Sequence, residues 1–208
     1  MTLYDSLLAF TLAAALLTLT PGLDTALVLR TASVESRAQA FKVALGINAG
    51  CFIWGAMVAF GLGALIAVSE LAYSILKYCG AAYLCWLGVN MLLSRGGGLT
   101  AAAEGEAPKA KQNGFMKGLL GNLLNPKMGV FYVSFLPQFI PHGQPLIAWT
   151  FGLVAIHVVL GQTWSTVLIL ATRPLGRFLK RSAVIRWMDR TTGTLFILFA
   201  AKLALSKR

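Results

Sequence analysis

Apolar runs of about twenty residues recur along the whole chain, and they constrain its fold more than any other feature. Each run is long enough to cross the hydrocarbon core of a bilayer as a helix. Only 12% of the 208 residues are charged, which is about half the share found in an ordinary soluble domain. Too few polar residues remain to cover the surface of a soluble protein. The sequence therefore predicts an all-α integral membrane protein.

Windows of about twenty residues predict six membrane-spanning helices. They cover residues 4–29, 41–68, 71–93, 115–140, 146–172 and 187–205. The stretch 94–114 is rich in Gly, Ala, Lys and Glu and is typical of a mobile linker. It divides the chain into a first three-helix unit over 1–93 and a second three-helix unit over 115–208.

Lys and Arg are concentrated in the first, third and fifth connections, and the second and fourth connections contain neither. By the positive-inside rule, the charged connections and the linker are cytoplasmic and both termini lie outside. Lys202, Lys207 and Arg208 oppose this orientation, but the three connections outweigh them. Orientation in a membrane accounts for the net charge of +11, so no nucleic-acid partner is expected. The basic segment 174–189 is either an interfacial helix on the cytoplasmic face or an ordinary loop.

The two halves carry similar landmarks at corresponding places. In the third span Lys77-x-x-Gly80-x-x-Tyr83 precedes Trp86, and in the sixth Arg190-x-x-Gly193-x-x-Phe196 precedes Phe199. In the first and fourth spans, Thr20-Pro21-Gly22 corresponds to Asn125-Pro126-Lys127. Because each half has an odd number of spans, the second half must be inverted relative to the first. Inverted repeats with interrupted helices are typical of secondary transporters.

Proline interrupts the first and fourth spans, since it removes a backbone donor and crowds the preceding turn. Thr20-Pro21 and Asn125-Pro126 each place a capping residue directly before a proline. This pattern predicts that a helix begins there, with Thr20 and Asn125 as N-caps and the prolines as first residues. A helix that restarts inside the membrane presents free N–H groups, which persist only beside a cavity, water or a ligand.

Two charged residues accompany these breaks. Asp24 is the only acidic residue well inside a predicted span, and Lys127 is the most deeply placed cation. An ionisable residue within the membrane is a functional candidate because its burial is costly. The two match a zwitterion, with Asp24 taking an ammonium group while Lys127 and the N–H groups after Pro126 take a carboxylate. Two alternatives stay open: Asp24 and Lys127 pair with each other, or Asp24 neutralises the start of its own helix.

Further polar residues lie within the second and fifth spans. Asn48 and Gln162 are candidates for the substrate path. His157 is either a proton relay, because its unperturbed pKa lies near neutrality, or a hydrogen-bonded packing residue. Cys51, Cys79 and Cys85 are expected to be buried packing thiols. They form no cluster with histidines at metal-ligand spacing, so neither a metal nor a cofactor is expected.

TPGLD late in the first span and NPK in the fourth, in a six-span chain of this size, resemble the lysine-exporter superfamily. The nearest branch is the homoserine/threonine exporters, and Ala44-Leu45-Gly46-Ile47-x-x-Gly50 fits as well. The resemblance implies an inner-membrane, dimeric exporter of amino acids or close derivatives that is driven by the proton gradient. It carries over as site residues Pro21, Gly22, Asp24, Asn125, Pro126 and Lys127. The family usually has TPGPD, and Leu23 in place of the second proline relaxes the break by one constraint.

The predicted function is secondary active export of amino acids by proton antiport, with alternating access about a site between the breaks. A neutral substrate such as threonine or homoserine is favoured, since no further buried acid accompanies the site. The alternatives are an exporter of another small solute or cation in the same superfamily, or a transmembrane thiol redox protein. The first and fourth spans contain no cysteine, which disfavours the redox protein. No HExxH or GxSxG motif is present, so the chain is not expected to be an enzyme.

Overall fold

The computed structural model describes residues 3–68, 70–93, 113–141, 143–172, 178 and 181–205. All regular structure in these ranges is helical, and they contain no strand. The predicted all-helical class is therefore confirmed for the described part of the chain. The predictions for the linker as far as residue 112, for the turn at 142 and for 173–177 lie outside the described residues.

The first half consists of α1 (Leu3–Leu19), α2 (Leu23–Val34), α3 (Arg37–Val68) and α4 (Glu70–Leu93). The first predicted connection is almost entirely helical, because α2 and α3 both extend into it and leave only two residues between them. Ser36 there accepts a hydrogen bond of 3.2 Å from the backbone N–H of Gln39. Serine in this position caps the start of a helix, and this explains why α3 begins earlier than its apolar run.

The second half consists of α6 (Gly114–Leu123), α7 (Pro126–Val130), α8 (Leu146–Leu170) and α10 (Ser182–Leu205). Between α7 and α8 the chain continues as a π-helix, η1 (Phe131–Phe135), and a 3-10 helix, η2 (Leu136–Phe139). The last helix begins at Ser182 rather than at the predicted 187. The part of the basic segment from 182 to 189 is therefore not a loop, because it forms the first turns of α10, and its place at the membrane interface stays a prediction.

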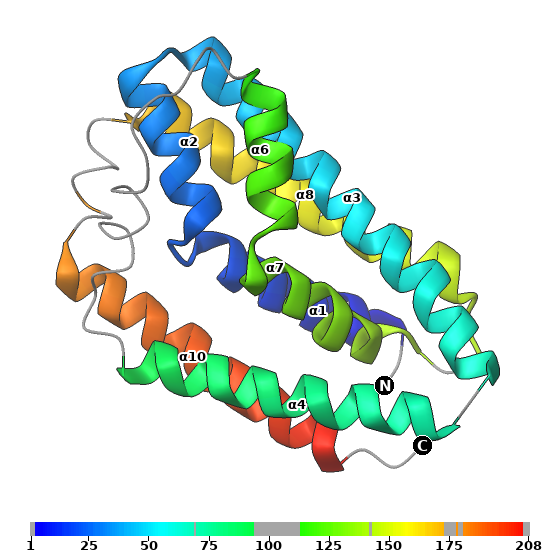
Figure 1. The fold of residues 1–208 in the computed structure, drawn as a ribbon. Helices are drawn as coiled ribbons and strands as arrows, with labels where there is room; N and C mark the ends of the chain where they lie inside the picture. Colours follow the sequence, from blue (N-terminus) through cyan, green and yellow to red (C-terminus); the bar gives the residue numbers. More distant parts are fainter. Residues whose placement is uncertain are drawn as a thin grey trace.

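The membrane-spanning character is clearest in three places of the described chain. Within α3, Arg37–Gly61 is long and apolar enough to cross a bilayer, and so is all of α8. Taken together, α1 and α2 are also long and apolar enough to form one span, which is bent by 49° at its break. Figure 1 shows that α1 begins and α10 ends at the same end of the molecule, which suits an even number of crossings. The six-span inverted repeat itself stays a prediction.

Glycines allow close helix contacts in both halves. Helix α4 packs along α10, and α3 packs along α6 and α8 (Figure 1). At the α4–α10 crossing, a Cβ on Gly88 would lie 2.7 Å from the carbonyl oxygen of Gly193. A Cβ on Gly193 would lie 2.6 Å from the carbonyl oxygen of Gly88. Small residues at this crossing let the two backbones meet. Gly193 therefore contacts Gly88, whereas the comparison of the two halves had aligned it with Gly80.

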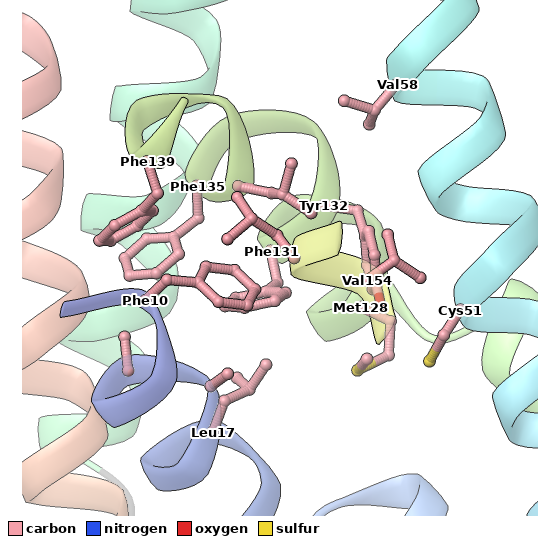
Figure 2. Packing of buried hydrophobic residues seen from close by; sticks show 14 of the residues in the cluster. Phe10, Leu17, Cys51, Val58, Met128, Phe131, Tyr132, Phe135, Phe139 and Val154 are labelled. Carbon is pink, nitrogen blue, oxygen red and sulfur yellow. The ribbon is translucent and has the colours of Figure 1, made fainter. Parts of the chain in front are cut away.

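Two apolar clusters fill the interior. Figure 2 shows the first, where the rings of Phe10, Phe131, Phe135 and Phe139 gather between α1 and the η1–η2 segment. The rings of Phe131 and Phe135 stack with centroids 5.1 Å apart. The second cluster joins α2, α3, α8 and α10 through Ala26, Val28, Leu29, Ala40, Val43, Ile47, Leu168, Ile169 and Ile185. The breaks in the first and fourth spans lie between these two clusters.

Candidate functional site at the helix breaks

The first break separates α1 from α2 at Thr20-Pro21-Gly22. Thr20 is not the N-cap of α2, so this prediction is wrong: Gly22 occupies that position with an extended backbone and no side-chain cap. Thr20 instead continues α1, because its backbone N–H bonds to Leu16 and its hydroxyl donates to the same carbonyl at 2.7 Å. The physical reason is that the proline disfavours helical geometry in the residue before it, which ends α1 there. The Thr20 hydroxyl also contacts the hydroxyl of Thr192 in α10.

The second break follows the prediction. Asn125 is the N-cap of α7, and its side-chain oxygen accepts a hydrogen bond of 3.1 Å from the backbone N–H of Lys127. Pro126 is the first residue of the helix, where its missing N–H costs nothing. The continuation as a π-helix is a rare geometry that occurs frequently at functional sites.

Lys127 connects the two breaks. Its Nζ donates to the carbonyl oxygens of Leu17 and Thr20, both at 3.2 Å. These carbonyls lie at the end of α1, where the helix stops and leaves acceptors and a negative dipole end. A Cβ on Gly22 would lie 3.6 Å from the same Nζ. The ammonium group of the fourth span therefore compensates the break in the first.

Asp24 lies in the first turn of α2 with its two oxygens in different surroundings. Oδ2 accepts a hydrogen bond of 2.9 Å from the side-chain amide of Asn122. Oδ1 is buried and has no partner in hydrogen-bond geometry in the described part of the chain, although the Asn125 side chain lies close enough to stabilise the carboxylate. Asp24 and Lys127 interact electrostatically but form no direct ion pair, unlike Lys117 and Glu35 at the surface, which lie 2.8 Å apart. The carboxylate thus keeps one oxygen unpaired beside a cation.

Two buried polar residues of this site were missed from the sequence. Asn122, which holds Asp24, lies in α6 one turn before the NPK break and is fully buried. An amide inside an apolar run was the available signal. Asp189 was placed at the edge of the last span, but the early start of α10 brings it inside, with 8% of its surface exposed. It interacts electrostatically with Lys127, so Asp24 is not the only acid in the helical bundle.

The remaining predicted residues form two hydrogen-bonded pairs. His157 in α8 and Tyr132 in η1 are both buried, with the imidazole Nδ1 2.8 Å from the phenol oxygen. Asn48 in α3 donates to the side-chain oxygen of Gln162 in α8 at 2.6 Å. Gln162 in turn donates to Thr166 at 3.4 Å. Both pairs link α8 to another element.

A cavity of about 60 Å³ lies between the breaks and helices α3 and α8, with room for about four to six water molecules. Of the predicted residues, Thr20, Gly22, Asp24, Asn48, Asn125, Lys127 and His157 line it. Pro21, Pro126 and Gln162 do not, and Gln162 reaches the cavity wall only through Asn48. The other lining residues are Leu17, Thr18, Leu23, Thr25, Ile47, Cys51, Met128, Gly161, Trp164, Ser165 and Leu168.

The cavity also lies at the junction of the two apolar clusters. Three residues belong both to the cavity wall and to the first cluster, namely Leu17, Cys51 and Met128. Figure 2 shows them beside the phenylalanine rings. Ile47 and Leu168 belong both to the cavity wall and to the second cluster. Each cluster therefore contributes apolar residues to the wall of the same cavity.

The cysteines do not form a redox or metal centre in the described part of the chain. Cys51 is buried at the cavity wall, whereas Cys79 and Cys85 in α4 are exposed, which corrects the expectation that all three are buried. Among the described residues, no group of three or more His, Cys, Asp or Glu side chains could hold a metal ion.

Comparison with known proteins covers nearly the whole chain. A family model described as LysE type translocator matches residues 15–207. The threonine efflux protein of Escherichia coli (strain K12) is 31% identical over 195 residues, which are 91% of this chain and 92% of that protein. The homoserine/homoserine lactone efflux protein of Salmonella typhimurium is 30% identical, with 94% of each chain covered. An uncharacterized membrane protein of Bacillus subtilis, YrhP, is 31% identical over 97% of this chain and 99% of its own. No solved structure matches the chain.

Proposed function

The chain belongs to the LysE type translocator family, and from this premise we propose that it exports neutral amino acids, or close derivatives, by proton antiport. Threonine and homoserine are the favoured substrates because relatives are named for their efflux. The sequence argument from a single buried acid does not support this choice, since Asp189 is also buried and interacts with Lys127. One observation carries the proposal: a carboxylate with an unpaired oxygen and a lysine ammonium line the same cavity at two helix breaks. The chemistry of an amino acid, one cationic and one anionic end on a small body, complements this pair.

The substrate's ammonium group binds Oδ1 of Asp24 in this proposal. Oδ2 is already held by Asn122, which fixes the direction of the carboxylate. The free oxygen then provides a charge-assisted hydrogen bond, which is stronger than a neutral one. The volume of the cavity restricts the site to compact solutes.

The substrate's carboxylate binds on the side of Lys127. Its Nζ lies at the carbonyls of Leu17 and Thr20, and the flexible lysine side chain exchanges one of them for the carboxylate. The N–H groups after Pro126, which the sequence assigned to the carboxylate, already donate to the side-chain and backbone oxygens of Asn125, so that expectation is wrong. The first N–H groups of α2 are the second source of donors instead, because its N-cap Gly22 supplies no side-chain cap. Lys127 thus binds the anionic end when the site is filled and the α1 carbonyls when it is empty.

Coupling to protons follows from competition at Asp24. A protonated Asp24 no longer attracts the ammonium group, so a proton entering from outside displaces the amino acid there. The two apolar clusters act as opposite gates, and alternating access opens one while the other stays packed. His157, which lines the cavity and bonds to Tyr132 in the π-helix, is the second candidate for a proton carrier.

We place the protein in the bacterial inner membrane, with three-helix units over 1–93 and 115–208, a cytoplasmic linker over 94–114 and both termini outside. A homodimer is part of the proposal. The membrane-protein relatives support the location, and the charge of the connections supports the orientation.

Replacing Asp24 tests the coupling. We expect Asp24→Asn in reconstituted vesicles to lose proton-driven transport of threonine and homoserine by about tenfold or more, because the amide has no charge to exchange. Overexpression in bacteria, followed by measurement of extracellular amino acids, first identifies the exported compound. Glu35→Gln removes a carboxylate that pairs with Lys117 at the surface and serves as the matched control. Undiminished transport by Asp24→Asn that still depends on the pH gradient would rule out Asp24 as the coupling residue.

A further inference from the structure

Three polar side chains of the cavity wall have buried atoms without a hydrogen-bond partner in the described part of the chain. They are Oδ1 of Asp24, Oγ1 of Thr18 and Nε1 of Trp164. Buried polar atoms in native proteins are nearly always paired, so an unpaired one requires an explanation. Four further unpaired atoms, in Thr31, Gln39, Asn122 and Thr150, belong to residues outside the cavity wall. Three on one wall indicate groups that a bound solute satisfies.

The hydroxyl of Thr18 differs from those of Thr11 and Thr163, although Thr31 and Thr150, away from the cavity wall, are also unpaired among the described residues. Thr11 donates to the carbonyl of Leu7 at 2.7 Å, and Thr163 donates to that of Val159 at 2.8 Å, each one turn back. This local bond is the usual way in which a helical threonine satisfies its hydroxyl. Thr18 forms no such bond. Its hydroxyl is therefore available both to donate and to accept.

The indole N–H of Trp164 lacks a hydrogen-bond partner among the described residues, whereas those of Trp54 and Trp149 have one. Nε1 of Trp54 donates to the carbonyl of Asn122 at 3.4 Å, and Nε1 of Trp149 donates to the side-chain oxygen of Gln144 at 3.1 Å. The Trp164 indole has no acceptor in the described part of the chain. An indole N–H is only ever a donor, so its partner must be an acceptor oxygen or nitrogen.

Helix α8 brings Trp164 to the same wall as other site residues. His157, Gly161, Ser165 and Leu168 line the cavity together with it, at the spacing of one helix face. Thr18 lies on α1 next to Leu17, whose carbonyl binds Lys127. The two unpaired groups thus come from different elements and face one chamber together with Asp24.

We infer that Trp164 and Thr18 are substrate ligands that recognise an uncharged oxygen on the side chain of the transported amino acid. The indole N–H donates to this oxygen, and the Thr18 hydroxyl accepts its hydrogen or, where the oxygen is that of a side-chain ester, donates as well. This inference rests on the proposed function, because Asp24 and Lys127 must first bind the charged ends. A cationic side chain is rejected since it offers only donors to the indole. An aliphatic side chain is rejected since it leaves both groups unpaired.

The test compares pairs of amino acids in which one member has a hydroxyl where the other has a methyl group. Full-length protein in vesicles under one fixed pH gradient transports threonine against valine and homoserine against norvaline. We expect the wild type to prefer the hydroxyl-bearing member of a pair. Trp164→Phe and Thr18→Val should each lower that preference by about tenfold, because each removes one hydrogen bond to the substrate and leaves the aliphatic member little affected.

Matched variants separate recognition from folding. Trp149→Phe removes an indole N–H that already has a partner, and Thr11→Val removes a hydroxyl bonded to its own helix, so both should keep the preference. Thr18→Ser retains a hydroxyl and should also keep it. If Trp164→Phe does not fold, the Thr18→Val and Thr18→Ser pair gives the answer alone.

The outcomes distinguish the two proposals. An unchanged preference in Thr18→Val and Trp164→Phe, with transport still lost in Asp24→Asn, overturns the ligand role of both residues and leaves the proposed function intact. A wild type without preference within either pair overturns the inference in the same way. A wild type that transports none of the four amino acids overturns both.

Discussion

At the scale of single residues, the site depends on Lys127 having two sets of partners. In the structure its Nζ satisfies two carbonyls that the break in the first span leaves open. A buried cation costs free energy unless it is paired, and these carbonyls with the nearby Asp24 and Asp189 reduce that cost. The same lysine is proposed to bind the substrate carboxylate. Its charge is therefore required both for the architecture of the break and for binding.

Lys127→Met tests this dual requirement. We expect export to fall by about tenfold or more, because the carboxylate loses a charged donor and the α1 carbonyls lose theirs. Lys127→Arg keeps the charge and should retain measurable export with altered selectivity. Lys117→Met, which removes a lysine paired with Glu35 at the surface, is the control. Export by Lys127→Met within about twofold of the wild type, measured in vesicles, would contradict the role.

Among the candidate residues, Asp24, Asn125 and Lys127 line the cavity, and Asn125 caps α7 as the sequence predicted. Charge and capping are local properties, so the sequence indicated these residues, but their roles in binding and coupling stay predictions. Sequence reasoning failed for Thr20, whose capping ability was overridden by the end of α1. It missed Thr18 and Trp164 because threonine and tryptophan are ordinary in a bundle until their partners are known.

At the scale of elements, close helix contacts hold the frame around the site. The α4–α10 crossing depends on Gly88 and Gly193, where each backbone lies against the other. Thr192, the neighbour of Gly193, contacts Thr20 at the end of α1. The crossing therefore also positions the break of the first span.

Gly193→Ala should weaken this crossing. The added Cβ would lie 2.6 Å from a backbone carbonyl oxygen, so the helices must separate. Such overpacking costs about 1–3 kcal/mol, and we expect a clear drop in the midpoint of thermal unfolding in detergent. Gly152→Ala in α8 places its Cβ in open space and should leave the midpoint unchanged. Equal midpoints for both variants would show that the contact is unimportant.

The extents of the helices followed from apolar length to within a few residues, with three informative exceptions. The end of α2 was set too early, and the start of α10 was set too late, because polar and basic residues hid helix that continues beyond the apolar run. The π and 3-10 turns over Phe131–Phe139 were not anticipated. In a segment that is mostly apolar, no periodicity distinguishes one helical geometry from another.

At the scale of the whole molecule, the proposed orientation places the linker inside the cell and both termini outside. A reporter enzyme active only outside the cytoplasm should be active when fused after Arg208 and inactive when inserted after Gly105 in the linker. The reason is the preference of Lys and Arg for the cytoplasmic side. Activity at both positions would contradict the odd number of spans proposed between the linker and the C-terminus, and the reverse pattern would contradict the orientation directly.

The two apolar clusters lie on different sides of the proposed transport cycle. One lies between α1 and η1–η2, and the other joins α2, α3, α8 and α10. The cavity shares wall residues with both. In the proposed cycle each cluster loosens in turn, so access to the cavity changes side without exposing it to both sides at once.

By itself the sequence determined that the chain is helical and apolar, that its first and fourth spans break, and which charges accompany the breaks. These are properties of chain length, proline geometry and side-chain charge, and all of them act locally. The tertiary structure decided that Lys127 reaches across to α1, that Asn122 holds Asp24, and that Thr18 and Trp164 face the cavity unpaired. The physical reason is that a membrane helix is apolar on every side, so its sequence does not indicate which face turns inward.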